Sequence, residues 1–198
     1  MKSLEELIKC FRRLPGVGPR QAERFSLYFL RAPDGETEAF IQALLKMRRQ
    51  IRFCPQCFNY NDSEGLCPIC ADDMRDKHIL CIVEEARDIE AIEKTHSFNG
   101  LYHVLHGSIS PLDGRNADSL KIKELLLRVQ NAEPAVKEVI IATNPDAEGE
   151  TTSLYLADLL RGLVGKITRI AYGMPLGGQI DYIDEITLKH ALKGRTKI

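Results

Sequence analysis

The sequence predicts an α/β protein with a helical N-terminal region, a small four-cysteine segment and a C-terminal helical tail. From residue 79 onward, apolar runs of β type alternate with helical patterns, and the four cysteines form two Cys-x2-Cys pairs. Strands that are apolar almost throughout and alternate with helices are typical of a parallel sheet covered on both faces. At 198 residues, the chain is long enough for one such domain and smaller units beside it.

Two helices are predicted around a glycine hairpin near the N-terminus. Ser3 and Glu6 fit the capping box of a first helix that is expected to end near Arg13. The hairpin is Leu14-Pro15-Gly16-Val17-Gly18, and Pro19 is well placed as the first residue of the second helix. The order of elements is therefore helix, hairpin, helix.

The N-terminal region is basic. Residues 1–53 hold eleven Lys and Arg against six Asp and Glu, a net charge of +5, whereas the remainder holds sixteen against twenty-two, a net charge of −6. Asp34 and Gly35 are expected to break the helical pattern before a third helix, which ends in the cationic residues Arg48, Arg49 and Arg52. A basic head on an acidic body indicates that the head meets a polyanion.

The hairpin is a candidate phosphate-binding site. Gly16 and Gly18 allow a close approach of the backbone, so their amides and the positive end of the second helix can face a phosphate oxygen. Arg20 and Arg24 follow one turn apart, where they would neutralise neighbouring phosphates. The alternative is a tight turn beside solvated arginines. The basicity of the region favours binding, which would be independent of DNA sequence because such contacts reach only the backbone.

The doubled cysteine motif predicts one structural Zn²⁺ per chain. Each Cys-x2-Cys turn brings two thiolates to one side, and two turns complete a tetrahedral site that leaves no position for substrate. The alternatives are unligated buried thiols or redox pairs. Cys10 and Cys81 are expected to be ordinary buried cysteines. The predicted ligands are Cys54, Cys57, Cys67 and Cys70.

The α/β body is predicted to place acidic residues at one edge of its sheet. We expect strands at 79–83, 102–105, 139–142 and 167–172, and helices near 88–94, 120–129 and 151–163. Glu84 follows the first strand, whereas Asn144, Asp146, Glu148 and Glu150 follow the third. Converging carboxylates there would suit Mg²⁺. The alternative, which is favoured for each acid alone, is a set of favourable charges at a helix N-terminus.

With these motifs in order, the chain resembles the RecR family of bacterial recombination mediators over nearly its whole length. The resemblance depends on the hairpin, the four-cysteine finger and two segments of Toprim type, 81–85 and 143–150. Further similar segments are 100–107 and 169–178. The family pattern implies a helix-hairpin-helix DNA-binding region at 1–53, a zinc finger at 54–76, a Toprim domain at 77–173, and a Walker-B-like segment with a helix at 174–198.

The resemblance implies a non-enzymatic clamp that binds DNA in recombinational repair. It implies work with RecO and RecF to load the RecA recombinase, and a tetrameric ring built from dimers. Gly16, Gly18, Arg20 and Arg24 would face DNA. The acidic site of Glu84, Asp146 and Glu148 would be vestigial or would meet partner proteins.

One departure argues against catalysis. Toprim enzymes carry an Asp-x-Asp-x-Glu run, whereas this chain has Asn144 in place of the first acid, which weakens Mg²⁺ binding without excluding it. The alternatives are a Mg²⁺-dependent enzyme acting on DNA phosphodiesters and a zinc-containing adaptor without DNA contact.

No apolar run is long enough to cross a bilayer, so we expect a cytoplasmic protein without membrane contact.

Overall fold

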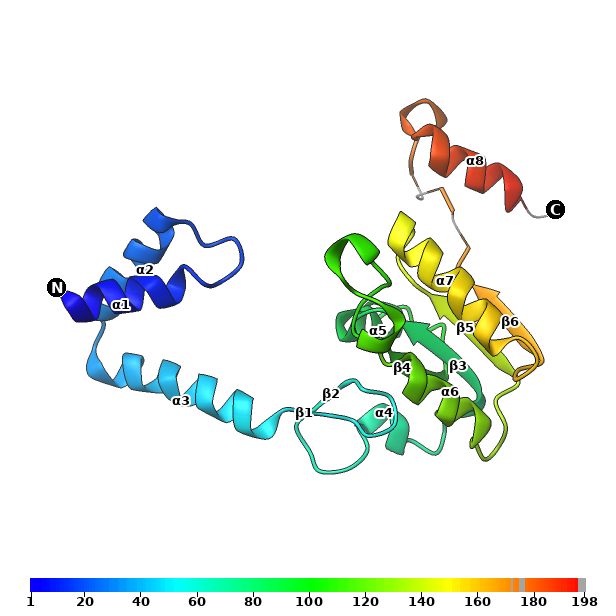
Figure 1. Cartoon of the computed structure of the whole chain (residues 1–198), viewed down its shortest axis with the longest axis horizontal. Coiled ribbons are helices and arrows are strands. Elements are labelled where there is room, and N and C mark those ends of the chain that lie inside the picture. Colours follow the sequence, from blue (N-terminus) through cyan, green and yellow to red (C-terminus); the bar gives the residue numbers. More distant parts are fainter. Residues whose placement is uncertain (172, 175–176, 196–198) are drawn as a thin grey trace. The chain divides into compact units, whose positions relative to one another are not determined.

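The computed structural model describes residues 1–171, 173–174 and 177–195, and the chain forms two compact units, Met1–Ile51 and Arg52–Ile198 (Figure 1). Tyr172, at the predicted end of the last strand, lies outside the described residues, as do 175–176 and 196–198 of the predicted C-terminal region. None of the described helices is long and apolar enough to span a membrane.

The first unit consists of three helices. The ring of Phe11 packs against Phe25 and Phe29, with centroids 5.6 and 6.0 Å apart, and Ala22 is fully buried between the first two helices. The helical spacing of these apolar residues therefore produces the expected contact face. The helices are α1 (Lys2–Phe11), α2 (Pro19–Arg31) and α3 (Asp34–Gln50).

Three details of the chain up to Arg52 differ from the prediction. Helix α1 already begins at Lys2 and ends at Phe11, so Ser3 lies inside the first turn and cannot cap it. Asp34 and Gly35 open α3 instead of preceding it, because an acid favours the positive end of a helix and glycine is tolerated in a first turn. Arg52 lies in a strand rather than in the cationic helix end.

The second unit begins with the four-cysteine segment. Strands β1 (Arg52–Phe53) and β2 (Tyr60–Asn61) form a short antiparallel ribbon, and α4 (Pro68–Ala71) follows. The side-chain amide of Asn61 donates hydrogen bonds to the carbonyl oxygens of Ser63 and Gly65, which closes the loop between the two cysteine pairs. The segment has little apolar interior apart from its cysteines and Ile69.

A four-stranded, fully parallel sheet forms the body, in the strand order β4-β3-β5-β6. Helices α6 and α7 cover one face and α5 covers the other, as the apolar strands predicted (Figure 1). The strands are β3 (Asp76–Val83), β4 (Gly100–Val104), β5 (Glu138–Ala142) and β6 (Lys166–Arg169). The helices are α5 (Ala86–Glu93), α6 (Ile122–Gln130) and α7 (Ala147–Leu160), with 3-10 turns η1 (Pro111–Asp113) and η2 (Ala117–Ser119) before α6.

The core of the body is divided between the two faces of the sheet. Leu80 and Ile82 of β3 pack with α6 and α7, whereas Cys81 and Val83 point to the opposite face and pack with α5. Phe58 and Ile69 of the four-cysteine segment join this second cluster. The segment is thus attached to the sheet by apolar contacts as well as by the chain.

The C-terminal part contains a short turn and a helix. The turn η3 (Ile180–Tyr182) falls in the Walker-B-like stretch, and α8 (Glu185–Lys193) follows. Asp184 caps α8 by accepting a hydrogen bond from the amide of Thr187 at 2.9 Å. The predicted helical tail is confirmed.

Candidate functional site

The glycine hairpin presents backbone groups to solvent. Gly16 has a φ of +76°, which favours glycine, and Gly18 caps α2 ahead of Pro19. A Cβ atom built on either glycine would meet no atom within 4 Å. Among the described residues, the amides of Gly16 and Gly18 form no hydrogen bond. The hairpin therefore offers unpaired N–H groups and the positive end of a helix to an approaching anion.

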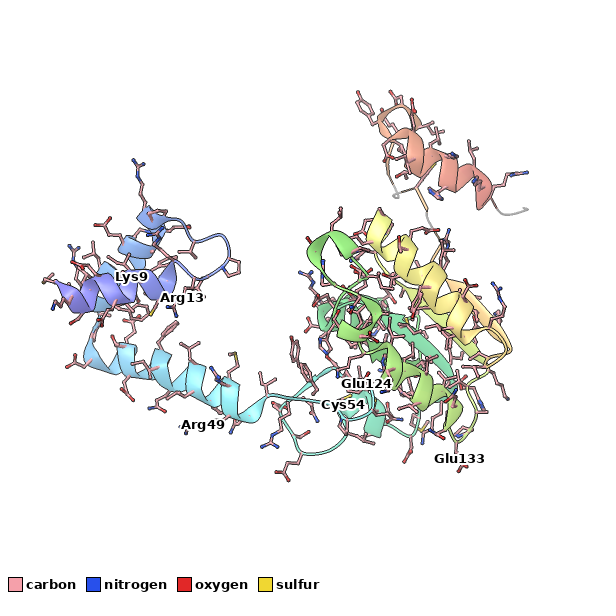
Figure 2. All side chains as sticks on the ribbon, viewed as in Figure 1. Lys9, Arg13, Arg49, Cys54, Glu124 and Glu133 are labelled. Atoms are coloured by element: carbon pink, nitrogen blue, oxygen red, sulfur yellow. The ribbon has the colours of Figure 1, made fainter. Side chains whose placement is uncertain are left out.

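The helical segments on either side of this hairpin carry cationic side chains. Arg20 and Arg24 are exposed on α2, and the guanidinium of Arg24 lies 5.8 Å from the centre of the Phe25 ring. Lys9 lies on α1 and Arg13 just after its end (Figure 2). Within the described part of the chain, neither Arg20 nor Arg24 forms an ion pair with a carboxylate. The positive charge of this region is thus available to a ligand.

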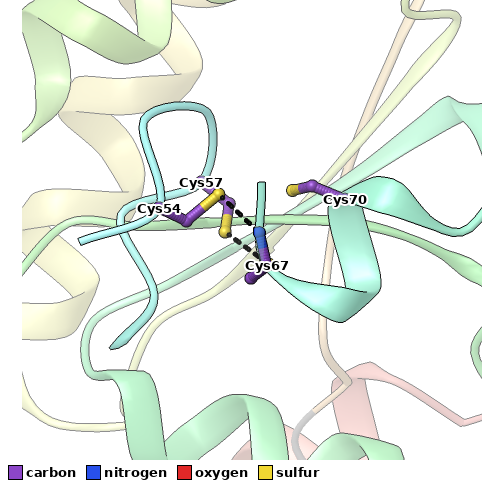
Figure 3. A group of neighbouring side chains, drawn as sticks. All are labelled: Cys54, Cys57, Cys67 and Cys70. Atoms are coloured by element: carbon purple, nitrogen blue, oxygen red, sulfur yellow. Dashed lines mark hydrogen bonds between the residues drawn. The ribbon is translucent and has the colours of Figure 1, made fainter. Parts of the chain in front are cut away.

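The four predicted zinc ligands lie together. Cys54, Cys57, Cys67 and Cys70 are at most 7% exposed, and their sulfurs all lie within 4.8 Å of one another (Figure 3). The Sγ atoms of Cys57 and Cys67 are 3.5 Å apart. Tetrahedral zinc with Zn–S bonds of about 2.3 Å separates its sulfurs by about 3.8 Å. The cluster fits a structural zinc ion.

The thiols of the cluster strongly influence one another's protonation. Hydrogen bonds from Cys57 and Cys70 lower the pKa of Cys67 to about 2, while the hydrogen bond to Cys67 raises the pKa of Cys57 to about 12. The neighbouring thiols raise the pKa of Cys70 as well. A zinc ion would stabilise all four cysteines as thiolates.

The finger closes the outer edge of the sheet. The amide of Val104 in β4 donates to the carbonyl of Cys57 at 2.8 Å. Two further carbonyls of the same strand accept side-chain hydrogen bonds, Gly100 from Arg75 at 3.2 Å and Tyr102 from Arg128 at 2.6 Å. The outer side of β4, where the described part of the chain supplies no further strand, is therefore satisfied by the finger and by two guanidinium groups.

At the carboxyl edge of the sheet, Glu84 is held by Asn144. The amide N and the side-chain Nδ2 of Asn144 each donate to the Glu84 carboxylate at 2.8 Å, one to each oxygen. Glu84 is 4% exposed, and burial raises its pKa while the bonds from Asn144 act in the opposite direction. Gly149 packs so closely that a Cβ atom there would lie 2.1 Å from the Asn144 carbonyl oxygen. Both carboxylate oxygens of Glu84 are thus already engaged.

The other two predicted acids are engaged elsewhere. Glu148 accepts hydrogen bonds from Ser110 at 2.6 Å and Ser108 at 3.3 Å, and Arg115 lies 3.6 Å from its carboxylate. Asp146 caps α7 by accepting from the Gly149 amide at 2.7 Å, so the helix starts four residues earlier than predicted near Thr151. Across the described residues, the four cysteines are the only metal-binding group of three or more His, Cys, Asp or Glu residues.

Several residues of these sites were not predicted from the sequence. Ser108, Ser110 and Arg115 lie in an irregular loop after β4, and their contact with Glu148 depends on how that loop folds back. Arg128 lies on α6 at a spacing that gives no sign of its contact with β4. Cys10, which was expected to be buried, is exposed, because the small first unit buries little beyond Ala22 and Ser26.

Comparison with known proteins covers every part of the chain described above. Residues 78–171 match the family model of the Toprim domain, and residues 51–72 match the four-cysteine zinc finger domain of RecR. Residues 4–48 match the RecR helix-hairpin-helix and residues 173–196 the RecR C-terminal model. The Recombination protein RecR of Clostridium perfringens is 47% identical over 196 residues, covering 99% of this chain and 97% of that protein.

The fold and the sites together define a Toprim-domain protein with a helix-hairpin-helix unit and a structural zinc finger. Its sheet and its four-cysteine cluster both agree with that class. The chain belongs to the RecR family.

Proposed function

We propose that this protein is a DNA-binding adaptor of recombinational repair that performs no chemistry on DNA. The observation that carries the proposal is the hairpin, where the amides of Gly16 and Gly18, which have no partner in the described part of the chain, lie beside the exposed Arg20 and Arg24. Helix N-termini and cationic side chains bind phosphate without reading bases. The relative from Clostridium perfringens, a recombination protein, supports this role.

The acidic corner supports an adaptor rather than an enzyme. A Mg²⁺-dependent reaction needs carboxylate oxygens that are free to hold the ion and its waters. Here Asn144 occupies both oxygens of Glu84, and serine hydroxyls occupy Glu148. We assign Glu84, Asp146 and Glu148 to a vestigial site or to contacts with partners of the RecO and RecF type, which would help to load RecA.

The remaining parts of the proposal concern assembly and location. We infer a homo-oligomer, a tetrameric ring built from dimers, that encloses DNA in the cytoplasm. Exposed apolar side chains along α3 support self-association, since Phe40, Leu44 and Met47 are 45–52% exposed. We also assign the zinc ligands to Cys54, Cys57, Cys67 and Cys70, and the domain limits to 1–53, 54–76, 77–173 and 174–198.

The test replaces Arg20 and Arg24 by Ala and measures DNA affinity against salt. Each lost phosphate contact reduces the slope of log K against log salt by about 0.9 on duplex DNA, so two contacts reduce it by about 1.8. The loss of DNA affinity in the variant should therefore be about tenfold larger at about 50 mM than at about 200 mM salt. Fluorescence anisotropy with two unrelated duplexes measures it, and the two sequences should behave alike.

The matched control replaces Lys94 and Lys123, which are exposed on the α/β body, and it changes the net charge equally. Wild-type affinity and slope in the Arg20 and Arg24 variant would refute the hairpin site. A wild-type protein that binds no DNA would favour the zinc-containing adaptor without DNA contact.

The Toprim fold itself favours one second candidate, a Mg²⁺-dependent enzyme that cuts or joins phosphodiesters. Supercoiled plasmid incubated with the protein and Mg²⁺ should stay uncut and supercoiled. Nicking or relaxation that disappears in Glu84→Gln would establish the enzyme and overturn the proposal.

A further inference from the structure

A partly buried guanidinium lies at the outer edge of β4. Arg128 reaches from α6 and donates through Nη1 to the carbonyl oxygen of Tyr102 at 2.6 Å. Its other terminal nitrogen, Nη2, is buried and has no hydrogen-bond partner within the described residues. A buried charged donor without a partner is costly, because it loses water and gains nothing in exchange. An interaction with a nearby negative charge would offset that cost.

The zinc finger places negative charge beside this guanidinium. Cys57 accepts a hydrogen bond from Val104, two residues from Tyr102 on the same strand. Two residues of a parallel strand span roughly 7 Å, so the guanidinium and the Cys57 carbonyl are close neighbours along one edge. Burial lowers the pKa of Arg128, whereas the charges of all four clustered cysteines act to raise it. The guanidinium therefore lies beside the segment that carries the four sulfurs.

Lys121, another cation near the finger, is already neutralised by a carboxylate. The Lys121 ammonium lies 5.0 Å from the centre of the Phe58 ring, but it is paired with Glu124 at 2.6 Å. Arg128 forms no ion pair with any carboxylate in the described residues. A zinc ion bound by four thiolates carries a net charge of −2, and its burial is unfavourable unless a positive charge compensates it.

We propose that Arg128 is the outer counter-charge of the zinc–thiolate site and strengthens zinc binding by the finger. Arg128 acts indirectly, since it contacts the Tyr102 carbonyl of β4 beside the finger and not the metal itself. Folding of the α/β body and metal loading of the finger are coupled through this side chain.

The experiment measures zinc affinity by competition with a chromogenic chelator in wild-type protein and in Arg128→Met. Methionine keeps much of the side chain's apolar stem and removes the charge. Loss of residues that surround a metal's ligands commonly weakens affinity by 10–100-fold, and we expect at least about tenfold here. Lys123→Met is the matched control, because Lys123 is an exposed cation on the same helix, and it should leave the affinity unchanged.

A second measurement separates this role from simple packing. The free energy of unfolding is compared for wild type and Arg128→Met, with zinc bound and after chelation. Arg128→Met should lower the folding equilibrium constant about tenfold more in the zinc-bound form than after chelation. This is the same factor as the expected loss of zinc affinity. An equal loss in both forms, or a zinc affinity like that of Lys123→Met, would overturn the proposal.

Arg128→Lys covers the case in which the methionine variant does not fold. It keeps the positive charge and gives up the planar fork, so zinc affinity should stay within about threefold of wild type. A lysine variant that binds zinc about tenfold more weakly would overturn the proposal, because it would show that geometry, not charge, is what the site needs.

Discussion

The side chain of His103 should make the stability of this protein depend on pH. His103 is fully buried in β4, and its Nε2 lies 2.8 Å from the carbonyl oxygen of Lys121, while its Nδ1 has no partner among the described residues. Burial is the main cause that lowers its pKa from 6.5 to about 4, and the charge of Arg128 adds to it. The folded protein therefore resists protonation that the unfolded chain accepts.

The direction and size of this pH dependence follow from the difference in proton binding between the folded and unfolded states. Between pH 4 and 6.5 the unfolded state binds more protons at this histidine than the folded state, so stability rises with pH. The contribution is fully present above about pH 6.5 and is lost as pH falls toward about 4. From these two pKa values, acidification from about pH 7.5 to about pH 5.5 should cost about 1 kcal/mol of unfolding free energy.

Urea unfolding at the two pH values, in saturating zinc, measures this loss. His103→Gln keeps an N–H that can reach the Lys121 carbonyl but does not titrate, so its stability should fall by about 1 kcal/mol less than that of wild type. His96→Asn is the control, because His96 is exposed and asparagine tolerates its positive φ of 53°. If wild type and His103→Gln lose stability in parallel, the reasoning is refuted.

Three further outcomes are expected. Gly149→Ala should destabilise by about 1–3 kcal/mol, although alanine normally stabilises a helix, because its Cβ would collide with the Asn144 carbonyl; a raised melting temperature would contradict this. Gly16→Ala should weaken DNA binding and cost about 1 kcal/mol, since alanine resists a φ of +76°, and wild-type affinity would count against the hairpin. Metal analysis should find one zinc per chain, and in native protein Cys10 should react with Ellman's reagent well before Cys81, whose pKa burial raises to about 12; six equally reactive thiols without zinc would disprove the site.

Features that are local in sequence were predicted well. The two Cys-x2-Cys turns must bring their sulfurs together if they bind one metal, so the spacing alone predicted a cluster that the fold then assembled. The parallel sheet was predicted equally well, since strands buried on both faces must be apolar throughout. Pro19 marked the start of α2 because its fixed φ and missing N–H suit a first helical position.

Features that depend on the meeting of distant segments were not predictable. Glu84 and Asn144 lie 60 residues apart, and only the register of β3 against β5 makes the amide a donor to the acid. From the sequence, Asn144 was only a missing carboxylate. The predicted starts of helices were wrong where polar residues could serve equally as caps or as first-turn residues, as at Ser3 and Asp34.

Closure of the β4 edge by the finger has a consequence for how the protein survives metal shortage. An open strand edge is a template for the strands of other chains, and such pairing leads to aggregation. Without zinc, the Cys57 carbonyl would be held against Val104 only by the weaker apolar contacts of Phe58 and Ile69, and part of that edge would be exposed more often. In cells starved of zinc, newly made protein should therefore collect in the insoluble fraction. The finger would thus protect the β4 edge from pairing with strands of other copies of the chain, in addition to bracing the sheet.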